Sequence, residues 1–205
     1  MFRVDAQHSF APPAQGPDWF GKILARNKFS ASIYLPTHGS IDDALALAAQ
    51  FPFIRRVVPT VEPHQLHLVP HHPLITSVRL STPSPAALAE LQHRSLAIEM
   101  DVKHWPISTS LPVALDGLPD DLHLPPNVYV KLTGFRLPPS PSQIHKLHKM
   151  FQNPGPARLL FASAWPLPGI TWKETLAAFT QAMGPQSIQF REQILGQSAC
   201  DFYGL

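Results

Sequence analysis

Short apolar runs separated by turn-forming residues recur along the chain, and each is rich in Val, Ile, Leu or aromatic residues. Because these runs are apolar at nearly every position rather than at alternate ones, they predict strands buried on both faces, as in a parallel sheet. Most prolines fall between the runs, where they mark turns. The runs comprise residues 2–8, 30–36, 54–62, 75–81, 96–102, 111–116, 128–133 and 158–163.

Four helix starts are readable between the runs. Ser40, Ser140 and Thr171 each precede an acid or amide by three residues, which is the spacing of a capping box. Ser84 is followed by proline, a favoured residue at the first helical position. Eight strands with intervening helices predict a single α/β domain over residues 1–205 that closes into a (β/α)8 TIM-like barrel, with a doubly wound sheet as the alternative.

The spacing of the runs is short in the middle of the chain. The fifth, sixth and seventh runs begin at Leu96, Leu111 and Val128. A crossover between parallel strands needs ~10–12 residues including its helix, so each connection has room for about one helical turn. We therefore predict a distorted, shortened barrel with reduced helices after strands 5 and 6. Its flank over strands 5–7 is expected to be flattened, exposed or covered by a second copy of the chain.

Composition limits the classes of function. With 44% hydrophobic and 15% charged residues, the chain can form a real core despite its 24 prolines. Its 16 Lys and Arg are scattered and form no basic face, so a nucleic-acid partner is not expected. No apolar run approaches the ~20 residues that span a bilayer, and the first ten residues are too polar for a signal peptide. The single cysteine, Cys200, fits a reducing compartment, so a cytoplasmic protein is expected.

Five segments, in order, resemble the amidohydrolase-related (amidohydrolase 2) family of metal-dependent hydrolases. The segment VDAQHSF with Pro12 and Pro13 resembles the family's first strand, and residues 112–117 (PVALDG) resemble its sixth-strand motif P-x-x-x-D-H. Residues 127–134 (NVYVKLTG), 156–166 (PARLLFASAWP) and 195–205 (LGQSACDFYGL) are similar to its seventh strand, eighth strand and closing helix. The resemblance implies a distorted (β/α)8 barrel, with the active site at the carboxyl ends of the strands.

In that family a divalent metal held by histidines and an aspartate lowers the pKa of bound water. This sequence departs from the motifs: the two first-strand histidine positions hold Gln7 and Ser9. Gly117 and Ala164 replace the sixth-strand histidine and the eighth-strand aspartate. Such side chains bind zinc poorly or not at all, so no cofactor is expected. Zinc or another divalent metal remains an alternative only if a strand-end bulge turns His8 inward. Side-chain alternation otherwise points His8 away from the face that carries Gln7 and Ser9.

Acids on the predicted strands form a second candidate set. Asp5 is expected to share the inward face with Gln7, either as a functional group or as a buried structural acid. Glu99, Asp101 and Lys103 alternate along strand 5 and therefore share one face. That face is either a charged cluster at the barrel mouth or a solvated outer edge. The short crossover favours the solvated edge.

Candidate substrate contacts are Arg79, Gln7 and Ser163. Arg79 in the segment ITSVRLS resembles a fourth-strand arginine of the family, where it would bind a substrate carboxylate through two hydrogen bonds. A structural ion pair is an equal alternative for Arg79. No base is identifiable for Ser163, and Lys131 is more typical of scaffold than of a catalyst.

Two functions follow from these observations. The loss of ligands at Ser9, Gly117 and Ala164 favours an amidohydrolase-like protein that is weakly active or noncatalytic and binds a small molecule or a protein. The alternative is a metal-independent hydrolase, lactonase or decarboxylase acting on a small carboxylated substrate in the same strand-end cavity. In that alternative, Arg79 orients the anion and one of the acids Asp5, Glu99 or Asp101 acts as acid or base. A small organic acid or lactone is the expected ligand.

Overall fold

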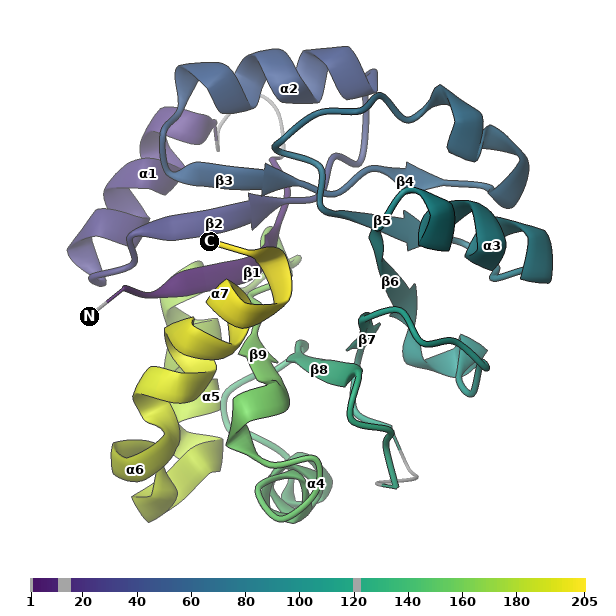
Figure 1. Cartoon of the computed structure of the whole chain (residues 1–205). Coiled ribbons are helices and arrows are strands. Elements are labelled where there is room, and N and C mark those ends of the chain that lie inside the picture. Colours follow the sequence, from purple (N-terminus) through teal and green to yellow (C-terminus); the bar gives the residue numbers. More distant parts are fainter. Residues whose placement is uncertain (1, 11–15, 120–122) are drawn as a thin grey trace.

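The computed structural model describes residues 2–10, 16–119 and 123–205, and its strands form two parallel sheets (Figure 1). Pro12 and Pro13, which were part of the first-strand resemblance, lie outside the described residues. One sheet has the order β1 (Val4–His8), β2 (Ala31–Tyr34) and β3 (Ile54–Val57). The other runs in chain order through β4 (Thr60–Val61), β5 (Ser77–Leu80), β6 (Ala97–Asp101), β7 (Val113–Asp116), β8 (Val128–Leu132) and β9 (Leu159–Phe161). All pairings are parallel, which confirms the α/β class.

The expected closed barrel is not formed, because the predicted strand over residues 54–62 is divided between the sheets. Its first half is β3 and its second half is β4. Val58 and Pro59 lie between the two halves, and a proline has no N–H to donate to a ladder. The Val58 N–H instead donates to the Tyr34 carbonyl at 2.9 Å, and the Pro59 carbonyl accepts from the Arg79 N–H at 2.9 Å.

At the other junction, β1 meets the segment after β9 without a regular ladder. The contact is an isolated parallel bridge between His8 and Trp165. The Ser9 N–H donates to the Trp165 carbonyl at 2.8 Å, and the Ala164 N–H donates to the Gln7 carbonyl at 3.0 Å. These bonds hold the two sheets together along one edge.

Helices cover the sheets unevenly (Figure 1). α1 (Pro17–Arg26) and α2 (Ile41–Gln50) lie beside β1–β3, and α3 (Pro85–His93) follows β5. α4 (Pro141–Met150) and α5 (Trp172–Met183) follow β8 and β9. Ser40, Ser140 and Thr171 form capping boxes, and the Ser84 hydroxyl accepts from the Ala87 N–H. The 3₁₀ turns are η1 (Pro63–Leu68), η2 (Val102–His104), η3 (Pro156–Arg158) and η4 (Gly184–Gln186).

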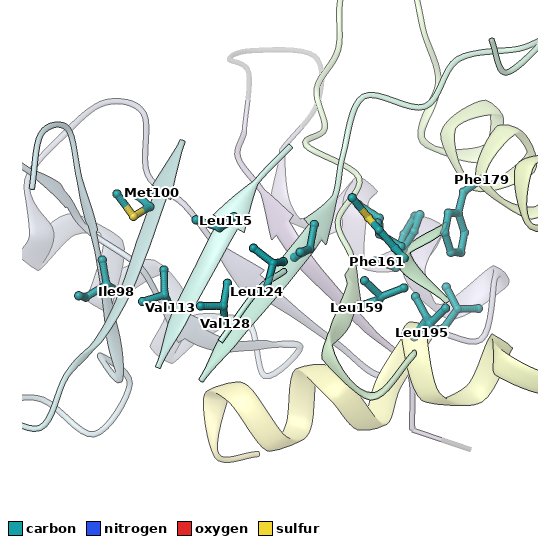
Figure 2. Packing of buried hydrophobic residues seen from close by; sticks show 14 of the residues in the cluster. Ile98, Met100, Val113, Leu115, Leu124, Val128, Leu159, Phe161, Phe179 and Leu195 are labelled. Atoms are coloured by element: carbon teal, nitrogen blue, oxygen red, sulfur yellow. The ribbon is translucent and has the colours of Figure 1, made fainter. Parts of the chain in front are cut away.

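The outer face of β6 and β7 is buried even though only η2 follows β6 and the described residues between β7 and β8 form no helix. Ile98, Met100, Val113 and Leu115 are fully inaccessible within the single chain and pack in one cluster (Figure 2). The flank predicted to be exposed or covered by a second copy is therefore covered by the chain's own loops, and nothing in its burial supports oligomerisation. The loop side chains packed against this core are Val102, Trp105, Ile107, Leu111, Leu118 and Leu124.

The C-terminal end of the chain packs against the first and last strands. α6 (Ser187–Glu192), the π-helical turn η5 (Gln193–Gln197) and α7 (Ser198–Tyr203) run consecutively, and α7 and η5 contact β1 and β9. Phe202 and Tyr203 belong to a second apolar cluster with Val4, Ala97 and Ala114. No helix in the described residues is long and apolar enough to cross a membrane.

The last turn of the chain is fixed at the amino ends of the strands. Arg56 Nε and the Thr76 hydroxyl both donate to the Tyr203 carbonyl, at 3.0 and 3.3 Å. A side chain at Gly196 would place its Cβ 2.0 Å from the Phe2 carbonyl oxygen, so only glycine allows η5 to lie this close to the N-terminal segment. These contacts hold Tyr203 against β3 and against the residue that precedes β5.

Candidate active site

A connected group of polar side chains fills the space between β1, the strands β5–β8 and α7, and we call it the inner network. It reaches from the buried end at Tyr203 to partly exposed groups at the carboxyl ends of the strands. Strand register aligns its members, since Arg79 pairs with Glu99 and Asp116 pairs with Lys131. The members are Gln7, Ser77, Arg79, Glu99, Asp116, Lys131, Thr133 and Tyr203.

Asp116 is the centre of the exposed end of the network. It is the last residue of β7, and its side chain is 17% exposed. Oδ2 accepts from Arg79 Nη1 at 2.8 Å and from Gln7 Nε2 at 3.3 Å, while Oδ1 accepts from the Thr133 hydroxyl at 2.7 Å. The carboxylate is therefore held from three elements at the position where parallel α/β folds place their reactive groups.

The charge of Asp116 follows from its neighbours. Burial would raise the pKa of its carboxyl group, but the positive charges of Lys131 and Arg79 and the hydrogen bonds from Thr133 and Arg79 outweigh that effect. The pKa lies below its ordinary value as a result. Asp116 is thus an ionised hydrogen-bond acceptor at neutral pH.

Beneath Asp116 lies a fully buried ion pair between Lys131 and Glu99. Lys131 Nζ donates to Glu99 Oε2 and to Gln7 Oε1, the second at 3.3 Å. Glu99 Oε1 accepts from the Ser77 hydroxyl at 3.1 Å and from the Tyr203 hydroxyl at 2.8 Å. Burial, followed by the charge of Glu99, raises the pKa of Tyr203 well above its usual value, so this phenol is a neutral donor.

The interpretation of strand 5 as a solvated outer edge is wrong for Glu99, which is completely inaccessible and faces the inner network. The error came from the short crossover, because loops rather than a helix bury the opposite face of this strand. Asp101 lies at the end of the same strand and is partly exposed. It accepts from the Lys103 N–H at 2.9 Å and forms an exposed ion pair with the Lys103 amine at 3.5 Å.

Asp5 does not share a face with Gln7, contrary to the expectation from alternation. The pairing of β1 with β2 shifts register between Asp5 and His8, so the regular alternation is broken there. Asp5 lies toward the helical layer, where its carboxylate accepts from Trp172 Nε1 at 2.7 Å and from the Ser163 N–H at 2.9 Å. Burial raises its pKa. Asp5 thus fastens α5 and the segment after β9 to β1.

Ser163 and His8 are also engaged away from the exposed end. The fully buried Ser163 hydroxyl donates to the Gln7 carbonyl at 3.2 Å and accepts from the Trp165 N–H at 3.1 Å. The His8 ring packs on Phe20 with 4.5 Å between ring centroids, and its burial lowers the pKa to about 3. His8 therefore belongs to an aromatic cluster beside α1, completed by Phe10 and Tyr34.

Two basic groups lie beside Asp116 at the strand ends, and their charge bears on which ions could bind there. Gln7 directs its carbonyl oxygen at the Lys131 ammonium, and Lys131 and Arg79 place two positive charges beside Asp116. Gly117 and Ala164 have positive φ angles of 105° and 50°, and neither carries a donor side chain. Within residues 2–10, 16–119 and 123–205, no group of three or more His, Cys, Asp or Glu side chains could hold a metal ion. A cation would also meet repulsion from both basic groups.

Asp116, Thr133 and Lys131, which belong to the inner network, were missed as site residues in the sequence. A signal existed for Asp116, because it is the polar residue that ends an apolar run and therefore lies at the carboxyl end of a strand. Lys131 offered a weaker signal, as a lysine inside an otherwise apolar strand. Its contacts to Gln7 and Glu99, at sequence separations of 124 and 32 residues, cannot be read from local pattern.

Two solved structures resemble this fold over their whole length. One is a probable 2-pyrone-4,6-dicarboxylic acid hydrolase from Acinetobacter baumannii with citric acid bound, which aligns with a TM-score of 0.78 and 19% identity over 100% of both chains. The other, from Pseudomonas putida and under the same provisional name, aligns with a TM-score of 0.72 and 19% identity over 99% of this chain and 97% of that one. Neither a protein-family model nor a curated protein matches the sequence. At this identity the likeness shows a shared α/β fold.

Proposed function

We propose that this protein is a hydrolase that opens a small carboxylated ester or lactone at Asp116 without a bound metal. The observation that carries the proposal is the ionised Asp116 carboxylate at the strand ends, held by Arg79, Thr133 and Gln7. The names of the two structural neighbours support the substrate class, since both refer to hydrolysis of a cyclic dicarboxylic acid and one protein holds citric acid. We also infer that the two sheets represent an incomplete, distorted form of the eight-stranded barrel.

Asp116 would act as the general base. It takes a proton from a water molecule as the water oxygen attacks the ester carbonyl carbon, and a tetrahedral intermediate forms. The bond between that carbon and the ring oxygen then breaks, and the proton on Asp116 returns to the departing oxygen. The products are a hydroxyl group and a carboxylic acid on one opened chain, and the acid then loses its proton to solvent at neutral pH. The lowered pKa keeps the Asp116 carboxyl group ionised at neutral pH, so it can accept a proton.

Arg79 would bind the substrate's own carboxylate. A guanidinium has five N–H donors in a planar fork, and the hydrogen bond to Asp116 uses one nitrogen, Nη1. The side chain is 19% exposed, so part of it faces the open end of the site. A carboxylate that binds the exposed edge of the fork would lie beside Asp116, which places the scissile carbonyl near the base.

Turnover in excess chelator tests the proposal. Purified protein is incubated with 2-pyrone-4,6-dicarboxylate and a panel of mono- and dicarboxylated lactones, and products are identified by mass. We expect ring-opened product, and Asp116→Asn is expected to lower kcat about 10²–10⁴-fold. Arg79→Ala should chiefly raise KM. Loss of carbon dioxide in place of a gain of water would identify a decarboxylase instead.

Matched controls are available on the surface. Asp18→Asn and Arg55→Ala make the same changes of charge at exposed positions of α1 and β3 and should leave turnover unchanged. Absence of turnover with every lactone, or equal turnover in the Asp116→Asn protein, would refute the proposed function.

A noncatalytic small-acid-binding protein is the second candidate, and one observation favours it. Both Asp116 oxygens already accept hydrogen bonds from protein groups, three in all, so the carboxylate would need to exchange a partner for water. Calorimetric titration with citrate separates the candidates. Binding that is lost in Arg79→Ala, together with no turnover of any lactone, would identify a binding protein.

A further inference from the structure

We propose that Lys131 is a positioning residue for Asp116, acting through Gln7, and that Glu99 and Tyr203 tie this arrangement to the C-terminal helix. The inference rests on the proposed function only for its catalytic consequence, since the arrangement itself can be tested without substrate. It is carried by an uninterrupted series of hydrogen bonds from Tyr203 through Glu99, Lys131 and Gln7 to Asp116.

Lys131 determines which way the Gln7 amide points. An ammonium group donates hydrogen bonds and accepts none, so only the amide oxygen of Gln7 can face it. The amide nitrogen of Gln7 is then directed at Asp116 Oδ2. If Lys131 were removed, the amide oxygen would lose its donor, and only the 3.3 Å hydrogen bond from Nε2 to Asp116 Oδ2 would hold the amide in place. By binding the oxygen of the Gln7 amide, Lys131 thus fixes the direction of the amide nitrogen, Nε2.

Glu99 holds Lys131 in this place. Its carboxylate binds the ammonium and is itself held by the Ser77 and Tyr203 hydroxyl groups, at 3.1 and 2.8 Å. Because Lys131 and Glu99 are buried, neither can exchange its partner for water without opening the fold. Tyr203 ends α7, so the position of the last helix is coupled to the orientation of Asp116.

The other groups that face Asp116 come from different elements. Arg79 on β5 contributes a cation and Thr133, after β8, contributes a hydroxyl donor. Asp101 lies opposite Asp116 in the ladder between β6 and β7 and is paired with Lys103. Removing Lys131 takes away one of two positive charges beside Asp116 but leaves Arg79, so Asp116 stays ionised and its orientation is the property that changes.

The test uses a charge-balanced double variant, Lys131→Met with Glu99→Gln, because Lys131→Met alone would leave a buried unpaired carboxylate. The double variant removes both charges and keeps both shapes, which such cores usually tolerate. Met100→Ala serves as the control, since it opens the apolar outer face of β6 without touching the inner network. Folding of each variant is checked by thermal unfolding.

Two measurements decide the matter. The first is the Gln7 side-chain amide signal in nitrogen-15 NMR, assigned with a Gln7→Leu variant. We expect one sharp pair of amide protons with slow exchange in the native protein and in Met100→Ala, and at least tenfold faster exchange in the double variant. The second is steady-state kinetics, where a displacement of this kind lowers kcat about 10–100-fold while KM changes less than about threefold.

The outcomes separate this inference from the proposed function. An unchanged Gln7 amide signal in the double variant overturns the positioning role, whatever the kinetics show. Loss of amide protection in a protein that turns over no substrate supports the arrangement and refutes the hydrolase. A fall in kcat of equal size in Met100→Ala would mean that stability alone controls activity, and would also overturn the inference.

Discussion

Titratable groups are buried in both the inner network and the aromatic cluster beside α1, but the two sites favour opposite forms of these groups: charged in the first and neutral in the second. In the inner network, Glu99 is completely inaccessible and Lys131 is 1% exposed, yet each is bonded to several partners. In the aromatic cluster beside α1, the His8 ring is just as inaccessible, but neither ring nitrogen makes a regular hydrogen bond within the described part of the chain. The first site keeps a charged pair inside the fold, whereas the second keeps a neutral ring.

This difference shows what a buried charge requires. Desolvation opposes the charged form at both sites, and only neighbouring charges or hydrogen bonds can offset it. At His8 burial outweighs the opposite effect of the Ile33 backbone, and the pKa falls to about 3. At Asp116 the positive charges of Lys131 and Arg79, together with the hydrogen bonds to the carboxylate, outweigh desolvation. The pKa falls because the ionised form is favoured. The same direction of shift therefore means opposite charge states.

The largest effect is expected from Lys131→Met alone. This change leaves Glu99 with two hydroxyl donors and no cation, and breaking a buried pair in this way costs about 3–5 kcal/mol of unfolding free energy. Chemical denaturation measures the loss. Adding Glu99→Gln should restore most of it, because the second change removes the uncompensated charge. A loss below about 1 kcal/mol in the single variant would show that water reaches Glu99.

Leu115→Ala on the opposite face of the same sheet should cost about 3 kcal/mol, because a buried leucine is replaced by a cavity. Leu115 is fully inaccessible although the described residues between β7 and β8 form no helix. The change in unfolding free energy thus measures how well the loops seal this flank, and Leu132→Ala, on the helix-flanked β8, is the matched control. A much smaller loss at Leu115 would mean that the loop cover opens readily.

The sequence predicts much of this architecture because its signals are local. Apolar runs locate the strands, and the hydroxyl groups of Ser40, Ser84, Ser140 and Thr171 locate helix starts, since capping depends on residues only three positions apart. The division of residues 54–62 into β3 and β4 was missed. The prediction treated these residues as one strand and gave too little weight to Pro59 within them.

The candidate site was less predictable, because its geometry depends on contacts between distant strands. Arg79 and Gln7 do meet, through Asp116, but Asp5 does not join them since a register shift in β1 reverses its direction. A bulge of this kind leaves no compositional signal. The inward orientation of Glu99 was missed for a related reason: crossover length says which face lacks a helix, but not whether loops cover it.

Lowering the pH should destabilise the fold through His8 by about 2 kcal/mol between pH 7.5 and pH 5. The pKa of its imidazole is about 3 when folded and 6.5 in an exposed state, so the unfolded chain binds more protons as the pH drops below 6.5. Stability is therefore lost as the pH falls. Denaturation at several pH values measures the slope, and His8→Phe, which retains an aromatic ring, should remove this part of it. Asp5, whose raised pKa acts in the opposite direction, is present in both proteins and cancels in the comparison. Equal slopes in the two proteins would show that His8 is hydrated.

The smallest effect is expected from Ser77→Ala, which tests whether the hydrogen-bond donors to Glu99 stabilise its carboxylate independently of one another. The Ser77 hydroxyl is one of three donors to Glu99, and the other two, from Lys131 and Tyr203, remain after the change. Losing one such hydrogen bond costs about 1 kcal/mol when the acceptor keeps other partners. If the network works as a unit, combining Ser77→Ala with Tyr203→Phe should cost more than the sum of the two single changes, because Glu99 is then left with the ammonium alone. Strict additivity in a double-mutant cycle would mean that each hydroxyl acts independently, and the contrast with the neutral His8 ring would then depend on the ion pair alone.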